Sequence, residues 1–100
     1  MQKNNSVVLT SLAKEDLLDC FLKGIDEWGN QQAQDYAEQI DNTIQLLAQN
    51  PNMGAECHQL YNGARCFPIG RHIIYYRFSN NTIEVARILH QRMNESQHLK

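Results

Sequence analysis

The stretch at residues 63–94 constrains the fold more than any other part of this sequence. It holds three segments rich in β-branched and aromatic residues, at positions 64–69, 72–79 and 82–89. Gly70-Arg71 separates the first two segments, and Asn80-Asn81, which tolerates positive φ, separates the second from the third. Strand-forming runs joined by such short connections predict an antiparallel meander of three strands.

Both faces of this expected sheet are largely apolar, because alternation along each strand assigns its side chains to two opposite faces. One face takes Ile73, Tyr75 and Arg77, the other takes Ile74, Tyr76 and Phe78, and in the last strand Ile83, Val85 and Leu89 oppose Ala86 and Ile88. A chain this short can cover one face with its own helices. We therefore expect the other face to be covered by a partner or to remain an exposed patch.

Two amphipathic helices are expected before the meander. The first follows Thr10, a residue suited to capping a helix, and ends at Gly29. Its apolar residues recur at spacings of three and four and are expected to pack in the core: Leu18, Phe21, Leu22, Ile25 and Trp28. The second helix carries an apolar stripe over residues 33–47, and Pro51 prevents its continuation.

The order of these elements predicts the fold class. A short buried strand at residues 7–9 precedes the helices, and a polar linker at residues 55–62 follows them. One hundred residues suffice for one core, so we expect a single domain over residues 1–100, with 93–100 as a short C-terminal tail. The order β-α-α-β-β-β predicts an α+β fold, in which an antiparallel helix hairpin packs on one face of a mostly antiparallel four-stranded sheet.

Composition points to the cytoplasm and away from metal or cofactor chemistry. The sequence shows neither an apolar run of membrane-spanning length nor a signal peptide. Its three cysteines, Cys20, Cys57 and Cys66, form no CxxC motif and are expected to be reduced thiols. A zinc site built from Cys57-His58, Cys66 and His72 is disfavoured because closely spaced ligand pairs are missing. We therefore expect a cytoplasmic protein without metal or cofactor.

Charge is divided unequally along the chain. Residues 1–62 carry three basic and nine acidic side chains, a net charge of −6, whereas residues 63–100 carry six basic and two acidic ones, a net charge of +4. The expected helices are acidic and the expected sheet is basic. A positive patch of this local kind suits an acidic protein segment, a phosphate backbone or both.

Four segments carry a resemblance to a known family. They are Leu9-Thr10, residues 44–51 with Gly54, residues 70–77, and above all Arg87-Ile-Leu-His-Gln-Arg-Met93. Together they resemble the ParE toxins of bacterial toxin–antitoxin modules, within the ParE/RelE superfamily, and the likeness covers residues 7–94. It implies a toxin that poisons DNA gyrase without catalysis of its own and blocks replication.

The resemblance also implies a hetero-oligomer with a ParD-type antitoxin. The toxin would then associate with operator DNA only indirectly, through the antitoxin. By the alternation above, Arg77 and Arg87 share a face, and two like charges there invite a shared acidic partner. We expect Tyr75, Arg77 and Arg87 to bind the antitoxin. His90, Arg92 and Met93, where the last strand meets the tail, are expected to target gyrase.

Two alternatives stay open. A RelE-like, ribosome-dependent mRNA endonuclease would need a base, an acid and cations around one phosphate, and Arg71, Arg77, Arg87 and His90 could supply some of these groups. The chain lacks the tyrosine near the end of the last strand that many such nucleases use, and its acidic helices suit ribosomal RNA poorly. The other alternative is an inert or purely regulatory member, which growth arrest on expression without antitoxin would exclude.

Overall fold

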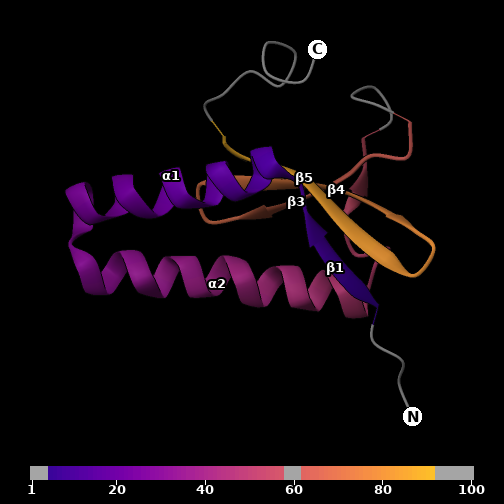
Figure 1. Cartoon of the computed structure of the whole chain (residues 1–100), viewed down its shortest axis with the longest axis horizontal. Helices are drawn as coiled ribbons and strands as arrows, with labels where there is room; N and C mark the ends of the chain where they lie inside the picture. The colour runs from indigo at the N-terminus through magenta and orange to yellow at the C-terminus, as the bar shows by residue number, and fades with distance from the viewer. Residues whose placement is uncertain (1–4, 58–61, 92–100) are drawn as a thin grey trace.

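The computed structural model describes residues 5–57 and 62–91 and has two layers, a helical hairpin and a five-stranded sheet (Figure 1). The helices are α1 (Ser11–Trp28) and α2 (Asn30–Gln49). The strands are β1 (Ser6–Leu9), β2 (Ala55–Glu56), β3 (Arg65–Ile69), β4 (His72–Ser79) and β5 (Thr82–His90). The predicted α+β class, with an antiparallel helix hairpin on one face of the sheet, is confirmed.

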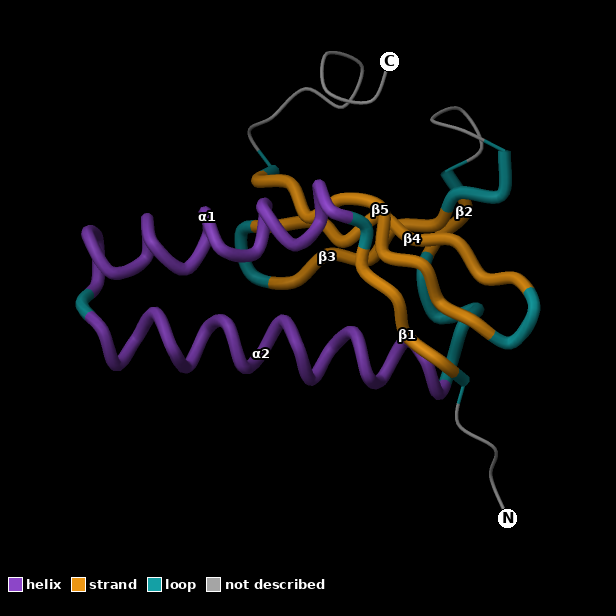
Figure 2. The backbone as a smooth tube through the Cα atoms, in the orientation of Figure 1, coloured by secondary structure: helices purple, strands orange, loops and turns teal. Residues whose placement is uncertain are grey.

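The hairpin begins and turns where the sequence predicts. The Thr10 hydroxyl accepts a hydrogen bond from the backbone N–H of Ala13 at 3.1 Å and so caps α1. Gly29, with φ of +88°, turns the chain into α2. The closed end of the hairpin at Gly29 projects past the sheet (Figure 2). Within the described ranges, neither helix combines the length and the apolarity that crossing a membrane requires.

The sheet has the strand order β1-β5-β4-β3-β2, in which only the β1–β5 pair is parallel. The meander β3-β4-β5 is the one predicted, and Asn80 and Asn81 at its second turn have φ of +51° and +58°. The two-residue strand β2 adds a fifth strand inside the expected linker. The first strand was expected to be buried, but it is buried only in part, because Val8 is 49% exposed.

An irregularity in β5 changes which side chains reach the core. Tyr75 pairs with Arg87 but Tyr76 pairs with Val85, so Ala86 is an extra residue in β5. Val85 and Ile88 consequently pack in the same hydrophobic core, although simple alternation predicted opposite faces for them. The core lies between the helices and the sheet and includes Ala13, Ile40, Ile44, Leu47, Ala48, Ile74, Tyr76, Ile83, Val85 and Ile88.

The second face of the sheet is not the exposed apolar patch that we expected. Tyr75 and Leu89, which lie outside the main core cluster, are each only 2% exposed. Of the exposed apolar side chains, Val8 of β1 lies on this face, opposite Val7 and Leu9, which pack against the core, whereas the most exposed one belongs to α1. The apolar surface that a partner could use is therefore in part helical.

The side of α1 that faces the core was predicted correctly only in part, since Phe21, Ile25 and Trp28 of the expected stripe are half-buried. Leu18 and Leu22 are 57% and 51% exposed, although both belong to the apolar stripe expected in the core. Small and medium side chains face inward instead: Ala13, Leu17, Cys20 and Gly24. A methyl group on Gly24 would lie 3.2 Å from Cβ of Ala33, so the missing side chain permits close approach of α1 and α2.

Candidate functional site

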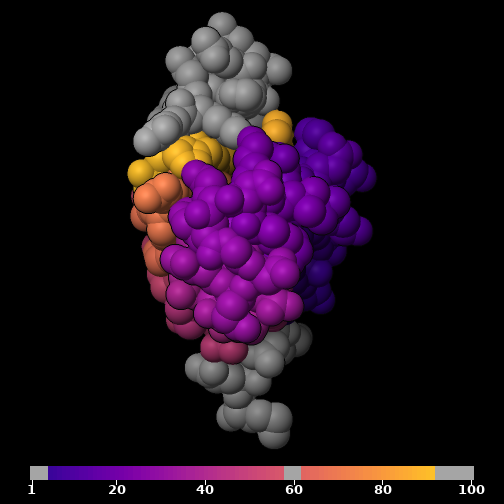
Figure 3. Space-filling model, turned by 90° about the vertical axis from the view of Figure 1, so that its left-hand side faces the viewer, coloured from indigo at the N-terminus to yellow at the C-terminus, as the bar shows by residue number. Residues whose placement is uncertain are grey.

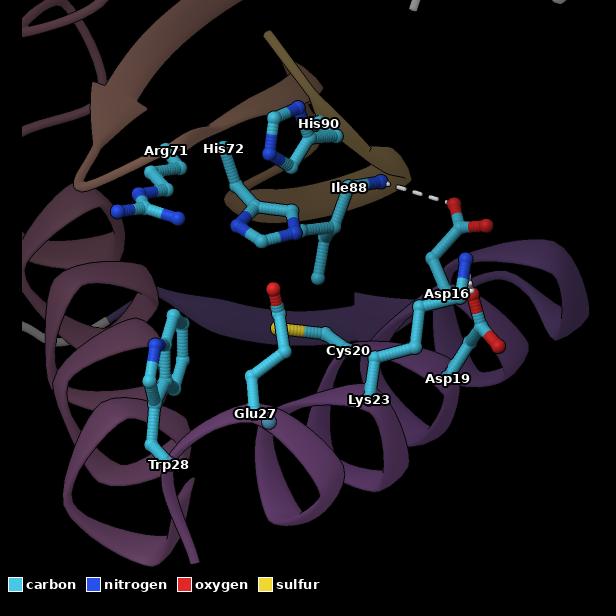
Figure 4. A pocket seen from close by; sticks show the side chains of 11 residues that line it. Asp16, Asp19, Cys20, Lys23, Glu27, Trp28, Arg71, His72, Ile88 and His90 are labelled. Carbon is cyan, nitrogen blue, oxygen red and sulfur yellow. Dashed lines mark hydrogen bonds and ion pairs between the residues drawn. The ribbon is translucent and has the colours of Figure 1, made fainter. Parts of the chain in front are cut away.

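A cavity of about 320 Å³ lies between α1, the β3–β4 turn and the end of β5 (Figure 4). Seen from the closed end of the hairpin, the β3–β4 turn and the end of β5 lie side by side along the helices (Figure 3). The helix contributes Asp16, Asp19, Cys20, Lys23, Gly24, Glu27 and Trp28, and the sheet contributes Arg71, His72, Ile88 and His90. One wall of the cavity is therefore acidic and the other basic.

The hydroxyl of Tyr36, on α2, holds the turn that forms the basic wall. It accepts a hydrogen bond from the backbone N–H of Arg71 at 3.0 Å, donates one to the carbonyl of Ile69 at 3.0 Å, and lies 2.8 Å from Nδ1 of His72. A hydroxyl has one proton and two lone pairs, so all three contacts are satisfied together when His72 carries its proton on Nδ1. That tautomer leaves Nε2 of His72 as a hydrogen-bond acceptor.

Burial favours the uncharged forms of two groups that line the cavity, His72 and Cys20. Desolvation lowers the pKa of His72 below its ordinary value of 6.5, and the neighbouring His90 and Lys23 lower it further. The rings of His72 and His90 lie nearly perpendicular, with centroids 5.2 Å apart. Burial also raises the pKa of the Cys20 thiol to about 11, so Cys20 is protonated and a poor nucleophile at neutral pH.

The predicted site residues do not gather at one place. Arg71 and His90 line the cavity. Arg77 lies five residues further along β4 than His72, beside a smaller surface hollow near β1, where it pairs with Glu84 at 3.1 Å. Tyr75 is buried. Arg92 and Met93, together with the expected tail at 93–100, lie outside the described residues.

Arg87 forms the bridge between α1 and β5 at the edge of the cavity. Its Nε and Nη2 donate to the Asp16 carboxylate at 2.8 and 3.0 Å, and the backbone N–H of Ile88 donates to the same carboxylate at 3.0 Å. Arg77 and Arg87 therefore do not present two like charges to one shared acid, because each already has a carboxylate within the chain. That correction concerns the geometry, and the antitoxin-binding roles remain predictions.

Sequence reasoning missed part of this site. Trp28 was expected only as core packing, yet its ring lies under the Arg71 guanidinium, 5.7 Å from ring centroid to Cζ. Tyr36 and His72 meet across 36 residues of sequence, a contact that no local pattern indicates. Among residues 5–57 and 62–91, no three His, Cys, Asp or Glu side chains are grouped so that they could hold a metal ion.

Comparison with known proteins gives a consistent result. Residues 7–95 match the family model described as ParE toxin of the type II toxin–antitoxin system parDE. Toxin ParE1 of Caulobacter vibrioides is 38% identical over 91 residues, which is 91% of this chain and 94% of that protein. Toxin ParE1 of Mycobacterium tuberculosis is 36% identical over 86 residues, 85% of each chain.

Solved structures share the fold at lower sequence identity. A chain from the chromosomal ParDE system of P. aeruginosa superposes with a TM-score of 0.75 at 22% identity, covering 86% of this chain and 95% of that one. A chain of the toxin–antitoxin complex RelBE2 from Mycobacterium tuberculosis gives a TM-score of 0.67 at 16% identity, covering 88% and 99%. These two likenesses establish the fold alone.

Proposed function

This chain belongs to the ParE toxins of type II toxin–antitoxin systems, and from that membership we propose that it poisons DNA gyrase and so blocks replication. The observation that carries the proposal is the family match over residues 7–95, which includes both helices, β1 from Val7 onward, the other four strands and the Arg87 to Met93 motif. The toxin acts by binding gyrase and performs no catalysis of its own.

The arrangement of the candidate catalytic residues supports this choice over the RelE-like nuclease. Cleavage of RNA needs a base, an acid and phosphate-binding cations around one scissile bond. Arg71 and His90 share the cavity, but Arg77 lies with Glu84 beside a different hollow and Arg87 is engaged by Asp16. Four residues divided in this way do not assemble one phosphate site.

We propose further that a ParD-type antitoxin neutralises the toxin in a hetero-oligomer and alone contacts operator DNA. Both solved neighbours come from toxin–antitoxin systems, which supports an antitoxin partner. The exposed leucines of α1, Leu18 and Leu22, offer such a partner apolar surface. Of the three antitoxin contacts predicted from sequence, Arg77 has the most accessible side chain and Tyr75 offers little surface.

For gyrase we propose contacts at His90, Arg92 and Met93, where the last strand leads into the tail. His90 lies at the rim of the cavity, half-buried, at the end of β5. Deleting residues 93–100 should therefore abolish toxicity while the core stays folded, since the core cluster of the described residues extends along the chain from Ala13 to Ile88. Full toxicity of the truncated chain at equal expression would place the gyrase contacts elsewhere.

The decisive experiment assays one purified sample in two ways. Gyrase supercoiling and DNA cleavage are measured beside messenger-RNA integrity in a translating extract, each with and without the antitoxin. Inhibited supercoiling with cleaved DNA and intact messages is the expected result. Cut messages with unaffected gyrase would establish the nuclease instead. Absence of both effects, with no growth arrest in cells, would identify an inert or regulatory member.

A further inference from the structure

Arg71 differs from every other arginine in the part of the chain that the structure describes. In each of the other three, a guanidinium nitrogen lies close to a carboxylate oxygen. The distances are 3.6 Å from Arg65 to Glu56, 3.1 Å from Arg77 to Glu84 and 2.8 Å from Arg87 to Asp16. Arg71 has no carboxylate of residues 5–57 or 62–91 within ion-pair distance, and its side chain is exposed at the cavity. Its guanidinium is thus a cation whose charge the described chain leaves uncompensated.

The backbone of Arg71 is held rigidly, which suits a binding residue. Gly70 precedes it at φ of +57°. The Arg71 N–H donates to the Tyr36 hydroxyl at 3.0 Å, and its carbonyl accepts from the backbone N–H of Gln91 at 2.8 Å. The guanidinium lies over the ring of Trp28, a contact that restricts its rotamers without using its hydrogen-bond donors. Little side-chain freedom remains to be lost on binding.

The charges around the cavity select a ligand with one negative group. The charge of Lys23 is offset by Asp19 at 3.1 Å, and that of Arg87 by Asp16. These two pairs leave Glu27 as the remaining acid that lines the cavity, and it would repel a phosphate backbone that brings several charges. A single carboxylate placed against Arg71 meets one uncompensated guanidinium, which can bind it through two parallel hydrogen bonds.

We propose that this cavity receives one aspartate or glutamate side chain of the antitoxin and that Arg71 binds its carboxylate. The inference rests on the proposed function, because it takes the antitoxin as the partner. A cavity of about 320 Å³ accommodates a side chain and the adjoining backbone, and the Nε2 acceptor of His72 is available to a donor of the same segment. Arg71 is then an anchor of the toxin–antitoxin interface rather than a catalytic residue.

The test measures the affinity of the full-length antitoxin for the full-length toxin by calorimetry or surface plasmon resonance. Arg71→Ala should weaken binding by about 10- to 100-fold, mostly through faster dissociation, because a charge-assisted hydrogen bond is lost. Arg71→Lys should recover part of the loss, since it keeps the charge but not the paired donors. Lys14→Ala, which removes one positive charge on α1 outside the cavity, should change affinity less than threefold.

Each acidic residue of the antitoxin is then changed to its amide in a double-mutant cycle with Arg71→Ala. At one acidic position of the antitoxin, the effects of the two changes on affinity should differ from additivity by at least about fivefold. At the other positions the two effects should be additive. Wild-type affinity of Arg71→Ala, equal losses in Lys14→Ala, or the absence of any coupled acid would overturn the Arg71 proposal alone. Failure of the wild-type toxin to bind antitoxin would overturn the proposed neutralisation and this inference with it. Arg71-dependent binding of a DNA duplex would assign the site to phosphate instead.

Discussion

The guanidinium of Arg87 and the carboxylate of Asp16 meet across 71 residues of sequence and join β5 to α1. Two hydrogen bonds of 2.8 and 3.0 Å link the side chains, which are 17% and 14% exposed. The hydrogen bond from Arg87 to Asp16 is the main reason why the pKa of Arg87 is raised further above its ordinary value. The pair lies next to Ala86, where β1 has ended and the described part of the chain pairs β5 on its β4 side alone.

Removing the carboxylate should destabilise the fold. Asp16→Ala removes the carboxylate that accepts from the Arg87 guanidinium and the Ile88 N–H in a partly buried position, and we expect a loss of about 1–3 kcal/mol in the free energy of unfolding. Asp19→Ala is the control, because its pair with Lys23 is exposed and should contribute less than about 0.5 kcal/mol. Urea unfolding measures both, and equal losses would contradict a bridging role for Asp16.

The exposure of α1 shows why helical spacing alone did not identify its inner face. Leu18 and Leu22 have the spacing of a buried stripe, and so do the smaller residues that actually face inward. Close packing against α2 selects the small set, because Gly24 lies against Ala33. Hydropathy predicts that the leucines face the core, because they are the more apolar residues. It contains no information on how closely α1 approaches α2.

Truncating the exposed leucines should hardly affect stability. We expect Leu18→Ala and Leu22→Ala each to change the free energy of unfolding by less than about 0.5 kcal/mol, because their side chains are mostly in water. Leu47→Ala, at a position with no exposed surface, should cost about 2–5 kcal/mol. Chemical denaturation of the three variants compares them directly. A loss of several kcal/mol in the free energy of unfolding of either α1 variant would show that these leucines pack in the core after all.

The cavity was less predictable than the fold for a physical reason. Strands, turns and helix ends follow from local patterns such as Asn80-Asn81, Gly29 and Pro51, which sequence displays directly. The contacts of Tyr36 with the β3–β4 turn and the register shift at Ala86 depend on how distant segments pack. Arg71 and His90 could be selected as polar residues, but nothing in the sequence indicated their common cavity.

Removing the Tyr36 hydroxyl should loosen the turn that carries Arg71. In Tyr36→Phe the Arg71 N–H loses its acceptor, so we expect faster amide hydrogen exchange there and a stability loss of about 1–2 kcal/mol. Tyr76→Phe is a reciprocal control. The Tyr76 hydroxyl accepts from the Gly54 N–H at 2.9 Å, so exchange should accelerate at Gly54 and not at Arg71. Unchanged exchange at Arg71 in Tyr36→Phe would show that the turn is held by other contacts.

The last prediction concerns the titration of His72. Burial lowers its pKa in the folded chain below 6.5, whereas the unfolded chain retains a value near 6.5. Between the two pKa values the unfolded state binds more protons, so the free energy of unfolding should rise with pH through this window. On acidification the stability starts to fall as the pH approaches 6.5, and the full loss from His72 is reached below its folded pKa.

A proton NMR titration of the His72 ring, in the native chain and in concentrated urea, measures the two pKa values. His90→Gln should raise the folded pKa of His72 part of the way back, because the charge of His90 is the second cause of the lowering and burial is the first. His72→Gln should remove this residue's share of the pH dependence of stability. A folded pKa equal to the unfolded one would mean that water reaches His72 freely, which is incompatible with its partly buried contact to Tyr36.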